Sequence, residues 1–425
     1  MAIGDKIHLI NKEEVQGAIG NINNPLLDLP LNNSLAMKQG VGSVEFTRST
    51  TATYIDRYGV LKTAAVDEPR FEKDGLLIEG SSTNLKLYSK IDSANWVSSR
   101  SDIVENSAES PTGSTDASKV VYNEDGAIYL YRHEESVLGT YTASYFVKAG
   151  NTDGLFNISM HGNSFTNTRR VYFNLNDETF YASGDVTGSI EKLQDGWFRL
   201  SATATATVDN TGTPTYLDLL HVTNELAVDD YFYVYGAQLE KLPFATSYIP
   251  TTDSAVTRGV DFGTASAYNN VPDFSKGFSF VQDFVYGGPS TAAIVTQFNT
   301  VHSDALNKAY LFFRVANASS DITVHIANTA GLTIGSTLIR NATIGTKYRL
   351  AVTLDSAGMR GYVDGMLVFT QSGITQNDVL AYTNDRIFKF NGWGSSSNAG
   401  PLGKIHSENM RWYDRALTEQ EVRLA

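Results

Sequence analysis

The residues best suited to acid–base chemistry occur mostly as adjacent acidic pairs. These pairs are Glu124-Asp125, Glu134-Glu135, Asp177-Glu178 and Asp229-Asp230. An enzyme that cleaves glycans needs two carboxylates held about 5 to 10 Å apart across the sugar bond. Neighbours on a strand point to opposite faces, and charged neighbours in a turn usually face water. We therefore predict that these pairs lie in solvated turns, and they give no positive support to an enzyme.

The residues that serve metal, thiol and nucleotide chemistry lack the required spacing. The histidines stand singly, at His8, His133, His161, His221, His302, His325 and His406. There is no cysteine, no His-Glu-x-x-His motif, no Gly-x-Ser-x-Gly elbow and no Walker loop. The loops Asn123–Gly126 and Asp355-Ser356 offer oxygens that calcium could use, but turn formation is the favoured interpretation. The sequence predicts satisfied or surface histidines, no metal site and no cofactor.

Aromatic side chains on predicted loops or strand ends are candidates for carbohydrate binding, because sugar rings stack on aromatic faces. The candidates are Trp393, Trp96, Tyr129 and Tyr131. Trp393 lies in a polar loop, where its indole either packs under the loop or binds a ligand. Tyr129 and Tyr131 share one face of a predicted strand, which is either a binding face or a buried one. Trp197 and Trp412 lie in alternating strands, so we predict that both are core residues.

The overall composition restricts the class of partner. The chain has 425 residues, of which 33 are Lys or Arg and 46 are Asp or Glu, so its formal net charge is -13. An acidic protein repels phosphate backbones, which disfavours a nucleic-acid partner. We expect no membrane insertion, because no stretch approaches roughly 20 apolar residues. The N-terminal residues MAIGDKIHLINKEEV do not resemble a secretory signal.

Local turn and capping signals mark the elements that must position these residues. Asp56–Gly59 and Lys73–Gly75 carry glycine where a hairpin needs a positive φ, and Asp364-Gly365 separates two alternating apolar runs. Capping boxes predict short helices starting near Asn11 and Thr418. Between these two helices the apolar residues alternate with period two, which predicts strands with one wet and one dry face.

The spacing of these short strands predicts an all-β fold. We expect two antiparallel β-sandwich (jelly-roll) domains in tandem after a short N-terminal attachment and linker segment. The predicted boundaries are 1–25 for an N-terminal attachment segment with a short helix, 26–88 for a small strand and turn linker module, 89–252 for a first sandwich of jelly-roll type, and 253–425 for a second sandwich. The loop-rich linker is expected to pack on a neighbouring domain or a sister chain.

Three stretches resemble tail-fibre and other virion proteins of tailed bacteriophages. FTRSTTATY at Phe46–Tyr54 and LLIEGSSTNL at Leu76–Leu85 are similar to a linker module of such proteins. YGAQLE at Tyr235–Glu240 and PFATSYIPT at Pro243–Thr251 resemble the closing strand and exit of a carbohydrate-binding-module-like jelly roll. YVDG and RWYDRALT, the latter at Arg411–Thr418, resemble the C-terminal signature of laminin-G-like, concanavalin A-like lectin domains. The sequence departs from that signature at 406–409, where the family usually has an acidic pair.

The resemblance implies a bacteriophage virion structural protein, of tail-fibre or receptor-binding type, that adheres without catalysis to host-surface glycan. It implies contacts with other virion proteins through the N-terminal segment, a homotrimer, and a place on the virion after synthesis in the host cytoplasm. Two alternatives stay open. One is a head or collar decoration protein whose sandwiches bind neighbouring virion subunits, and the other is a glycan depolymerase.

Overall fold

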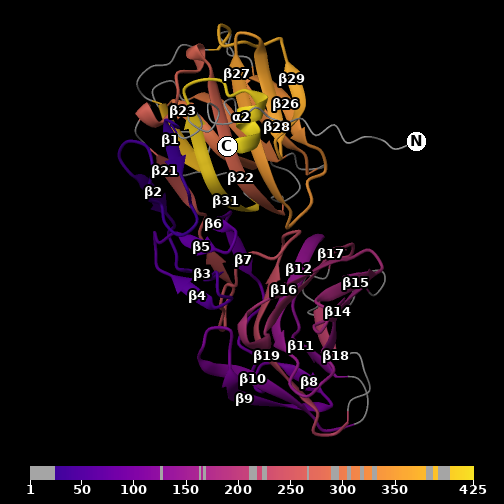
Figure 1. Cartoon of the computed structure of the whole chain (residues 1–425). Helices are drawn as coiled ribbons and strands as arrows, with labels where there is room; N and C mark the ends of the chain where they lie inside the picture. The colour runs from indigo at the N-terminus through magenta and orange to yellow at the C-terminus, as the bar shows by residue number, and fades with distance from the viewer. Residues whose placement is uncertain are drawn as a thin grey trace, which may run out of the picture.

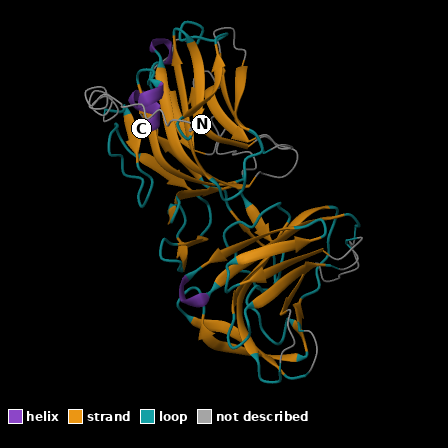
Figure 2. Ribbon diagram, turned by 45° about the vertical axis from the view of Figure 1, so that its right-hand side comes forward, coloured by secondary structure: helices purple, strands orange, loops and turns teal. Residues whose placement is uncertain are grey.

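Antiparallel strands make up nearly all of the regular structure. The computed structural model describes residues 24–124, 128–161, 164–165, 169–209, 218–222, 227–265, 268–288, 296–303, 308–315, 320–327, 333–379, 386–390 and 403–425. Two β-sandwiches lie one above the other, with a narrower region of short strands between them (Figure 1). Only short helical segments interrupt the strands and loops (Figure 2). The predicted all-β class is confirmed, whereas the helix predicted near Asn11 lies outside the described residues.

Two six-stranded sheets form the N-terminal sandwich. The first, here called the docked sheet, has the order β16 (Thr187–Lys192), β17 (Phe198–Ala206), β12 (Gly139–Lys148), β19 (Tyr231–Glu240), β10 (Thr115–Tyr122) and β9 (Ser101–Glu109). The second, here called the tyrosine sheet, has the order β15 (Thr179–Ser183), β14 (Arg169–Asn174), β13 (Leu155–Met160), β18 (Asp218–Val222), β11 (Tyr129–Tyr131) and β8 (Val97–Ser99).

The C-terminal sandwich pairs an eight-stranded sheet with a seven-stranded one. The larger sheet contains β29 (Met366–Gln371), β28 (Gly358–Val363), β27 (Lys347–Asp355), β22 (Phe278–Gly288), β31 (Lys404–Tyr413), β6 (Gly75–Glu79) and β5 (Arg70–Glu72), with β1 (Leu27–Leu29) also paired to β31. The smaller sheet contains β2 (Val44–Thr47), β21 (Phe262–Ala265), β30 (Arg386–Phe390), β23 (Thr296–Ser303), β24 (Lys308–Val315), β25 (Ile322–Ala327) and β26 (Thr333–Ile339).

The segment predicted as a linker module contributes directly to the C-terminal sandwich. Its strands β1, β2, β5 and β6 pair with strands of that sandwich, as the indigo ribbons beside the orange and yellow ones show (Figure 1). Two short ribbons complete the segment: β3 (Ala52–Ile55) with β4 (Leu61–Ala64), and β7 (Ser82–Asn84) with β20 (Val256–Arg258). Residues 26–88 therefore join both halves of the molecule rather than separating them.

The predicted turns and the C-terminal cap are confirmed. Gly59 and Gly75 have φ values of 84° and 104° at the ends of the β3–β4 and β5–β6 turns. Asp364 and Gly365 have φ values of 51° and 76° between β28 and β29. Helix α2 (Glu419–Leu424) begins with the predicted capping box, in which the Thr418 side chain accepts a hydrogen bond from the Glu421 N–H.

The linker hairpin β3–β4 covers the outer face of the docked sheet. Alternate residues of β12 point into the sandwich core, but Thr142, Ser144 and Phe146 point outward and are nevertheless buried. Phe146 packs with Leu61 of β4 and with Tyr248, which follows β19. The prediction that one face of β12 is exposed to solvent was therefore wrong. Local alternation of apolar and polar residues cannot show that another segment covers the sheet.

The tryptophans assigned to cores are confirmed there. Trp412 is fully buried in the C-terminal core and packs against Phe280, with ring centroids 4.7 Å apart. Trp197 is buried between the docked sheet and the linker, and its Nε1–H donates to the Glu109 carbonyl at 3.2 Å. Both indoles therefore stabilise the packing of elements that are distant in the sequence.

A fully buried ion cluster lies where the linker meets the start of the C-terminal half. Arg70 contacts Asp261 at 2.5 Å and Glu79 at 2.9 Å. Arg48 contacts Asp261 at 3.2 Å, and Arg258 lies 3.5 Å from Glu79. Burial alone would lower the pKa of Arg70, but Asp261 and Glu79 outweigh it and raise that pKa. Burial would likewise raise the pKa of Glu79, but Arg258 and Arg70 lower it.

The exit of the jelly roll is bonded into the same cluster. The Ser247 N–H donates to Glu79 Oε1 at 2.8 Å, and the Ser247 hydroxyl donates to Glu79 Oε2 at 2.8 Å. Arg70 in turn donates to the Ser247 hydroxyl at 2.7 Å and to the Thr53 carbonyl at 2.9 Å. The five charged residues thus connect the linker strands, the jelly-roll exit and the first strands of the C-terminal sandwich.

A second buried pair lies beside this cluster. His406 Nε2 is 2.8 Å from Glu72 Oε2, and the Ile55 N–H donates to Glu72 Oε1 at 2.8 Å. Burial raises the pKa of Glu72, but the hydrogen bond with His406 and the charge of Lys404 outweigh it and lower the pKa from its usual 4.5 to about 2. His406 is thus paired through Nε2, whereas its buried Nδ1 has no hydrogen-bond partner among the described residues, so the prediction of a satisfied histidine holds for only one of the two ring nitrogens.

Replacing Arg70 with methionine should destabilise the protein strongly, because two buried carboxylates would lose their main counter-ion. We expect a loss of about 3 to 5 kcal/mol in the free energy of unfolding, measured by urea denaturation. The matched control is R340M, since Arg340 forms a largely exposed pair with Asp321 at 3.8 Å and its loss should cost no more than about 1 kcal/mol. Equal unfolding curves for the two variants would contradict the role of the cluster.

Acid should destabilise the protein partly through Glu72. Because the folded-state pKa lies below the unfolded one, the stabilisation is complete above about pH 5 and is lost as the pH falls toward about 2. The unfolding free energy of E72Q should therefore change less than that of the wild type between about pH 6 and pH 3. The exposed substitution E135Q is the control, and it should leave the wild-type pH dependence in place.

Candidate functional site

Of the four sugar-binding candidates, Trp96 does not present an open ring. Trp393 lies in 391–402, outside the described residues. Trp96 is 5% exposed, and its Nε1–H donates to the Tyr88 carbonyl at 2.8 Å. Its ring meets Tyr145 edge-on at 6.2 Å, and the Lys86 ammonium lies 5.4 Å from its centroid. Packing in the core is therefore the better interpretation of Trp96, because a buried ring has no face for a sugar.

The other two candidates lie on the outer face of the tyrosine sheet. Leu130 is fully buried in the core, so its neighbours Tyr129 and Tyr131 point to the opposite side of β11. Both tyrosines are half-buried. Tyr131 is stacked with His133, with ring centroids 5.6 Å apart. The prediction that Tyr129 and Tyr131 share one strand face is confirmed.

A second pair of tyrosines occupies the far end of the same face. Tyr172 of β14 and Tyr181 of β15 are directly opposite each other in the register. Their rings are stacked, with centroids 4.6 Å apart and planes 10° apart, and Tyr181 is 63% exposed. Neither β15 nor this pair of tyrosines was predicted. The available signal was the Asn176-Asp177 turn between two alternating runs.

Polar residues lie between the two groups of tyrosines. On β13, Asn157 and Ser159 are paired in register with Tyr172 and Arg170 of β14. The Ser159 hydroxyl donates to Asn157 Oδ1 at 3.0 Å, and Arg170 Nε donates to the Ser159 hydroxyl at 3.1 Å. Asn157 and Ser159 are buried while Arg170 is exposed, so the two small residues position the guanidinium.

We name this surface the tyrosine face, defined by Tyr129, Tyr131, Arg170, Tyr172 and Tyr181. Four strand spacings separate β11 from β15, which corresponds to about 19 Å. An exposed aromatic stack offers a flat apolar surface, and the guanidinium and phenol groups beside it can bond to hydroxyls. The arrangement is suited to a polyhydroxylated ligand that lies along the sheet, and it contains no acid–base pair.

The described members of the acidic pairs include both buried and exposed carboxylates. Glu134 was predicted in a solvated turn, but this prediction was wrong, because it is buried and contacts Lys86 at 2.8 Å. Asp177 and Glu178 lie in an exposed turn, as predicted. Asp355 accepts hydrogen bonds from Arg360 and the Ala357 N–H, so it forms a turn. Within the described residues, no group of three potential metal-ligating side chains comes together.

Residues 406–409, where the sequence differs from the C-terminal lectin signature, also have a structural role. Glu408 contacts Lys347 at 2.6 Å, and the Asn409 amide donates to Asp283 at 2.8 Å. Asp283 also contacts Arg349 at 2.6 Å, and these hydrogen bonds lower its pKa despite the opposing effect of burial. The residues that replace the acidic pair thus hold neighbouring strands of the larger sheet together.

Comparisons with known proteins match part of the chain. Residues 287–423 are similar to the concanavalin A-like lectin/glucanases superfamily. Among solved structures, a native heptameric SAP-like pentraxin from Limulus polyphemus has a TM-score of 0.27 and 10% identity, over 35% of this chain and 68% of that chain. The receptor-binding domain of botulinum neurotoxin type G has a TM-score of 0.29 and 11% identity, over 38% of each chain. No relative was found among curated proteins.

None of the helices in the described part of the chain has the length and apolarity that crossing a bilayer requires.

Proposed function

We propose that this chain is a non-enzymatic adhesin of a tailed-bacteriophage particle, of tail-fibre or receptor-binding type, that binds host-surface glycan. The observation that carries the proposal is the stacked and exposed Tyr172–Tyr181 pair on the tyrosine face. The superfamily match at 287–423 supports a lectin-like role for the second sandwich. The resemblance of Phe46–Tyr54 and Leu76–Leu85 to phage linker sequence supports the virion setting.

Weak sites suit an adhesin that is present in several copies. A millimolar sugar contact contributes only about -4 kcal/mol, whereas linked copies raise avidity by roughly 10² to 10⁴. We therefore include in the proposal a homotrimer, attached to other virion proteins through residues 1–25 and displayed on the particle surface after synthesis in the host cytoplasm.

The proposal excludes catalysis because the described carboxylates near the tyrosine face have other partners or face water. Glu134 is held by Lys86. Asp177 and Glu178 lie in the β14–β15 turn, where the Asn174 amide donates to Asp177 at 2.6 Å and Lys192 contacts Glu178 at 2.5 Å. Glycan hydrolysis needs one protonated and one ionised carboxyl group across the sugar, and the carboxylates named above do not form such a pair.

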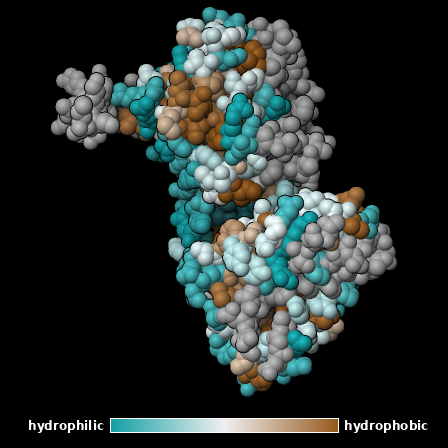
Figure 3. All heavy atoms as spheres, turned by 90° about the vertical axis from the view of Figure 1, so that its right-hand side faces the viewer, coloured by the Kyte–Doolittle hydropathy of each residue, from teal (hydrophilic) through white to brown (hydrophobic). Residues whose placement is uncertain are grey.

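An exposed apolar edge favours the second candidate, a head or collar decoration protein that binds virion subunits. Met366, Leu367 and Val368 of the edge strand β29 are 64%, 45% and 44% exposed. Figure 3 looks onto the side where β29 lies in Figure 1 and shows a broad apolar patch on the upper sandwich. Edge strands without charges or proline readily accept another strand.

Adsorption of the purified protein to host cells tests the proposal. Y181A should bind cells about 2- to 10-fold more weakly per site than wild type, because it removes the stacking surface, whereas Y181F should bind like wild type. L138A replaces another exposed apolar residue of the jelly roll and is the control. Labelled protein on cells, measured by flow cytometry, gives the readout.

Equal adsorption by Y181A and wild type would contradict the tyrosine face as the binding site. If particles that lack the protein adsorb normally to cells but are fragile, that result would favour the decoration protein. Release of reducing ends from host polysaccharide would instead favour the depolymerase.

A further inference from the structure

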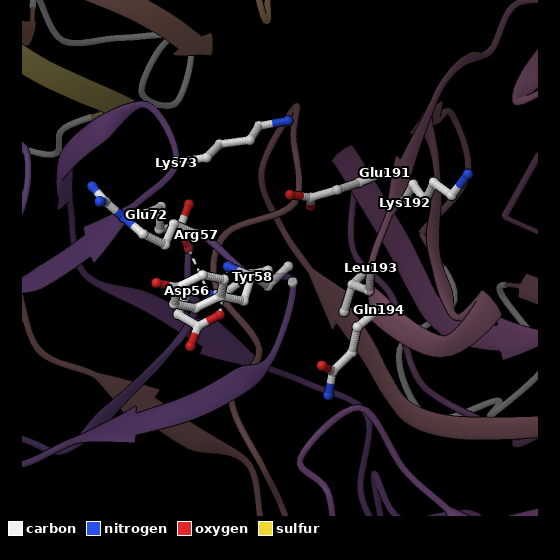
Figure 4. Close-up of a pocket in the computed structure, with 11 residues that line it drawn as sticks. Asp56, Arg57, Tyr58, Glu72, Lys73, Glu191, Lys192, Leu193 and Gln194 are labelled. Atoms are coloured by element: carbon white, nitrogen blue, oxygen red, sulfur yellow. Dashed lines mark hydrogen bonds between the residues drawn. The ribbon is translucent and has the colours of Figure 1, made fainter.

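A polar cleft separates the linker hairpin from the jelly roll, away from the tyrosine face. Its volume is about 220 Å³. On one side lie the β3–β4 turn, including Tyr58, and the β5–β6 turn, including Lys73. On the other side lie the end of β16 and the turn after it, including Glu191 and Gln194 (Figure 4). A space of this size holds about seven water molecules, which corresponds to one sugar ring rather than a chain.

Both walls of the cleft are fixed in place. The Gln194 N–H donates to the Gly59 carbonyl at 3.3 Å, and a side chain on Gly59 would come within 2.7 Å of the Gln194 nitrogen. Leu193, at the base, packs in the cluster that contains Leu61. The cleft is therefore built before any ligand arrives, which reduces the entropy lost on binding.

Several charged residues around the cleft are already engaged elsewhere. Asp56 accepts hydrogen bonds from the N–H groups of Tyr58 and Val60 and contacts Lys62 at 2.8 Å. Glu72 is bonded to Ile55 and His406, as described above.

Two of the three basic side chains that line the cleft turn away from the space. Arg57 donates to the Asn32 carbonyl at 2.9 Å, and Lys192 contacts Glu178 at 2.5 Å. Figure 4 shows the charged ends of both side chains pointing away from the cleft. These engaged groups form the frame of the cleft rather than its binding surface.

Four other side chains of the cleft are available to contact a ligand. Figure 4 shows Lys73 and Glu191 with their charged ends turned toward each other from opposite walls. Among the described residues, neither has a hydrogen-bond or ion-pair partner, and the same holds for the side-chain amide of Gln194. Tyr58 is 76% exposed at the rim. The set contains a donor, an acceptor, an amide that does both, and an aromatic ring, with no net charge.

We propose that this cleft binds one uncharged sugar residue, at a site separate from the tyrosine face. Each hydroxyl of such a ring both donates and accepts, which matches Lys73 and Glu191 on opposite sides. Because Lys73 and Glu191 face the space from opposite walls, a charged sugar would meet one repulsive charge for each attractive one, whereas a neutral ring can hydrogen-bond to both. This inference deepens the proposed function and rests on it for the source of the sugar, a host glycan.

Ligand-observed NMR on the intact protein tests the cleft. The probes are methyl glucoside, methyl galactoside and methyl mannoside, with glucuronate as the anionic comparison. In the Y181A background, which removes the exposed stacked ring of the tyrosine face, at least one neutral probe should still bind with millimolar affinity. K73A and E191A should each weaken that binding at least fivefold, and E135A and K276A, which change exposed residues elsewhere, should not.

The outcomes separate the two sites. Binding that disappears in Y181A alone would overturn the cleft site and leave the tyrosine face in place. Binding that survives Y181A but is lost in K73A would support the cleft even if adsorption to cells fails. If no neutral probe binds the Y181A protein and E191A lowers its melting temperature, Lys73 and Glu191 act only as an ion pair and the inference is wrong.

Discussion

The buried contacts among Arg48, Arg70, Arg258, Glu79 and Asp261 constrain the rest of the structure. A buried charge without a partner is costly, so these residues must come together whenever the chain folds. They lie on segments that are far apart in the sequence, and Arg48 and Asp261 are separated by 213 positions. Apolar replacements of a whole buried cluster are often tolerated or stabilising. We therefore infer that this cluster contributes chiefly by specifying one arrangement of the segments.

That arrangement decides which surfaces of the N-terminal sandwich are open. The linker is fixed to the C-terminal sandwich through β1, β2, β5 and β6, and its hairpin β3–β4 lies on the docked sheet. The tyrosine sheet is consequently the sheet that faces away from the linker. The hairpin also forms one wall of the cleft beside Tyr58. Both candidate binding surfaces thus depend on where the linker docks.

Local signals in the sequence were sufficient for the elements they control. Asp364-Gly365 and Thr418 were predictable because a turn and a helix cap need particular residues at particular positions. Contacts between distant segments were not predictable in this way. The linker strand β6 pairs with β31, and no local pattern indicates a partner more than 300 residues away.

In the candidate site, too, local features were predictable and contacts between distant segments were not. Tyr129 and Tyr131 were placed correctly on one face, because alternation is a local property. Trp96 was misjudged as a possible platform, since its burial depends on Tyr145 and Lys86 packing around it. Glu134 was misjudged for a related reason, because its partner Lys86 lies in the predicted linker. The Tyr172–Tyr181 stack depends on the pairing of β14 with β15, and β15 was not predicted.

The most direct measurement of the central claim is the distance between the two sandwiches in solution. The chain has no cysteine, so spin labels can be attached at S183C on β15 and T370C on β29, both exposed positions. Pulsed electron paramagnetic resonance should give one narrow distance distribution, and adding R70M should broaden it. A broad distribution in the otherwise unchanged protein, or the same narrow one with R70M, would contradict the claim that the buried ion cluster holds the two sandwiches in one arrangement.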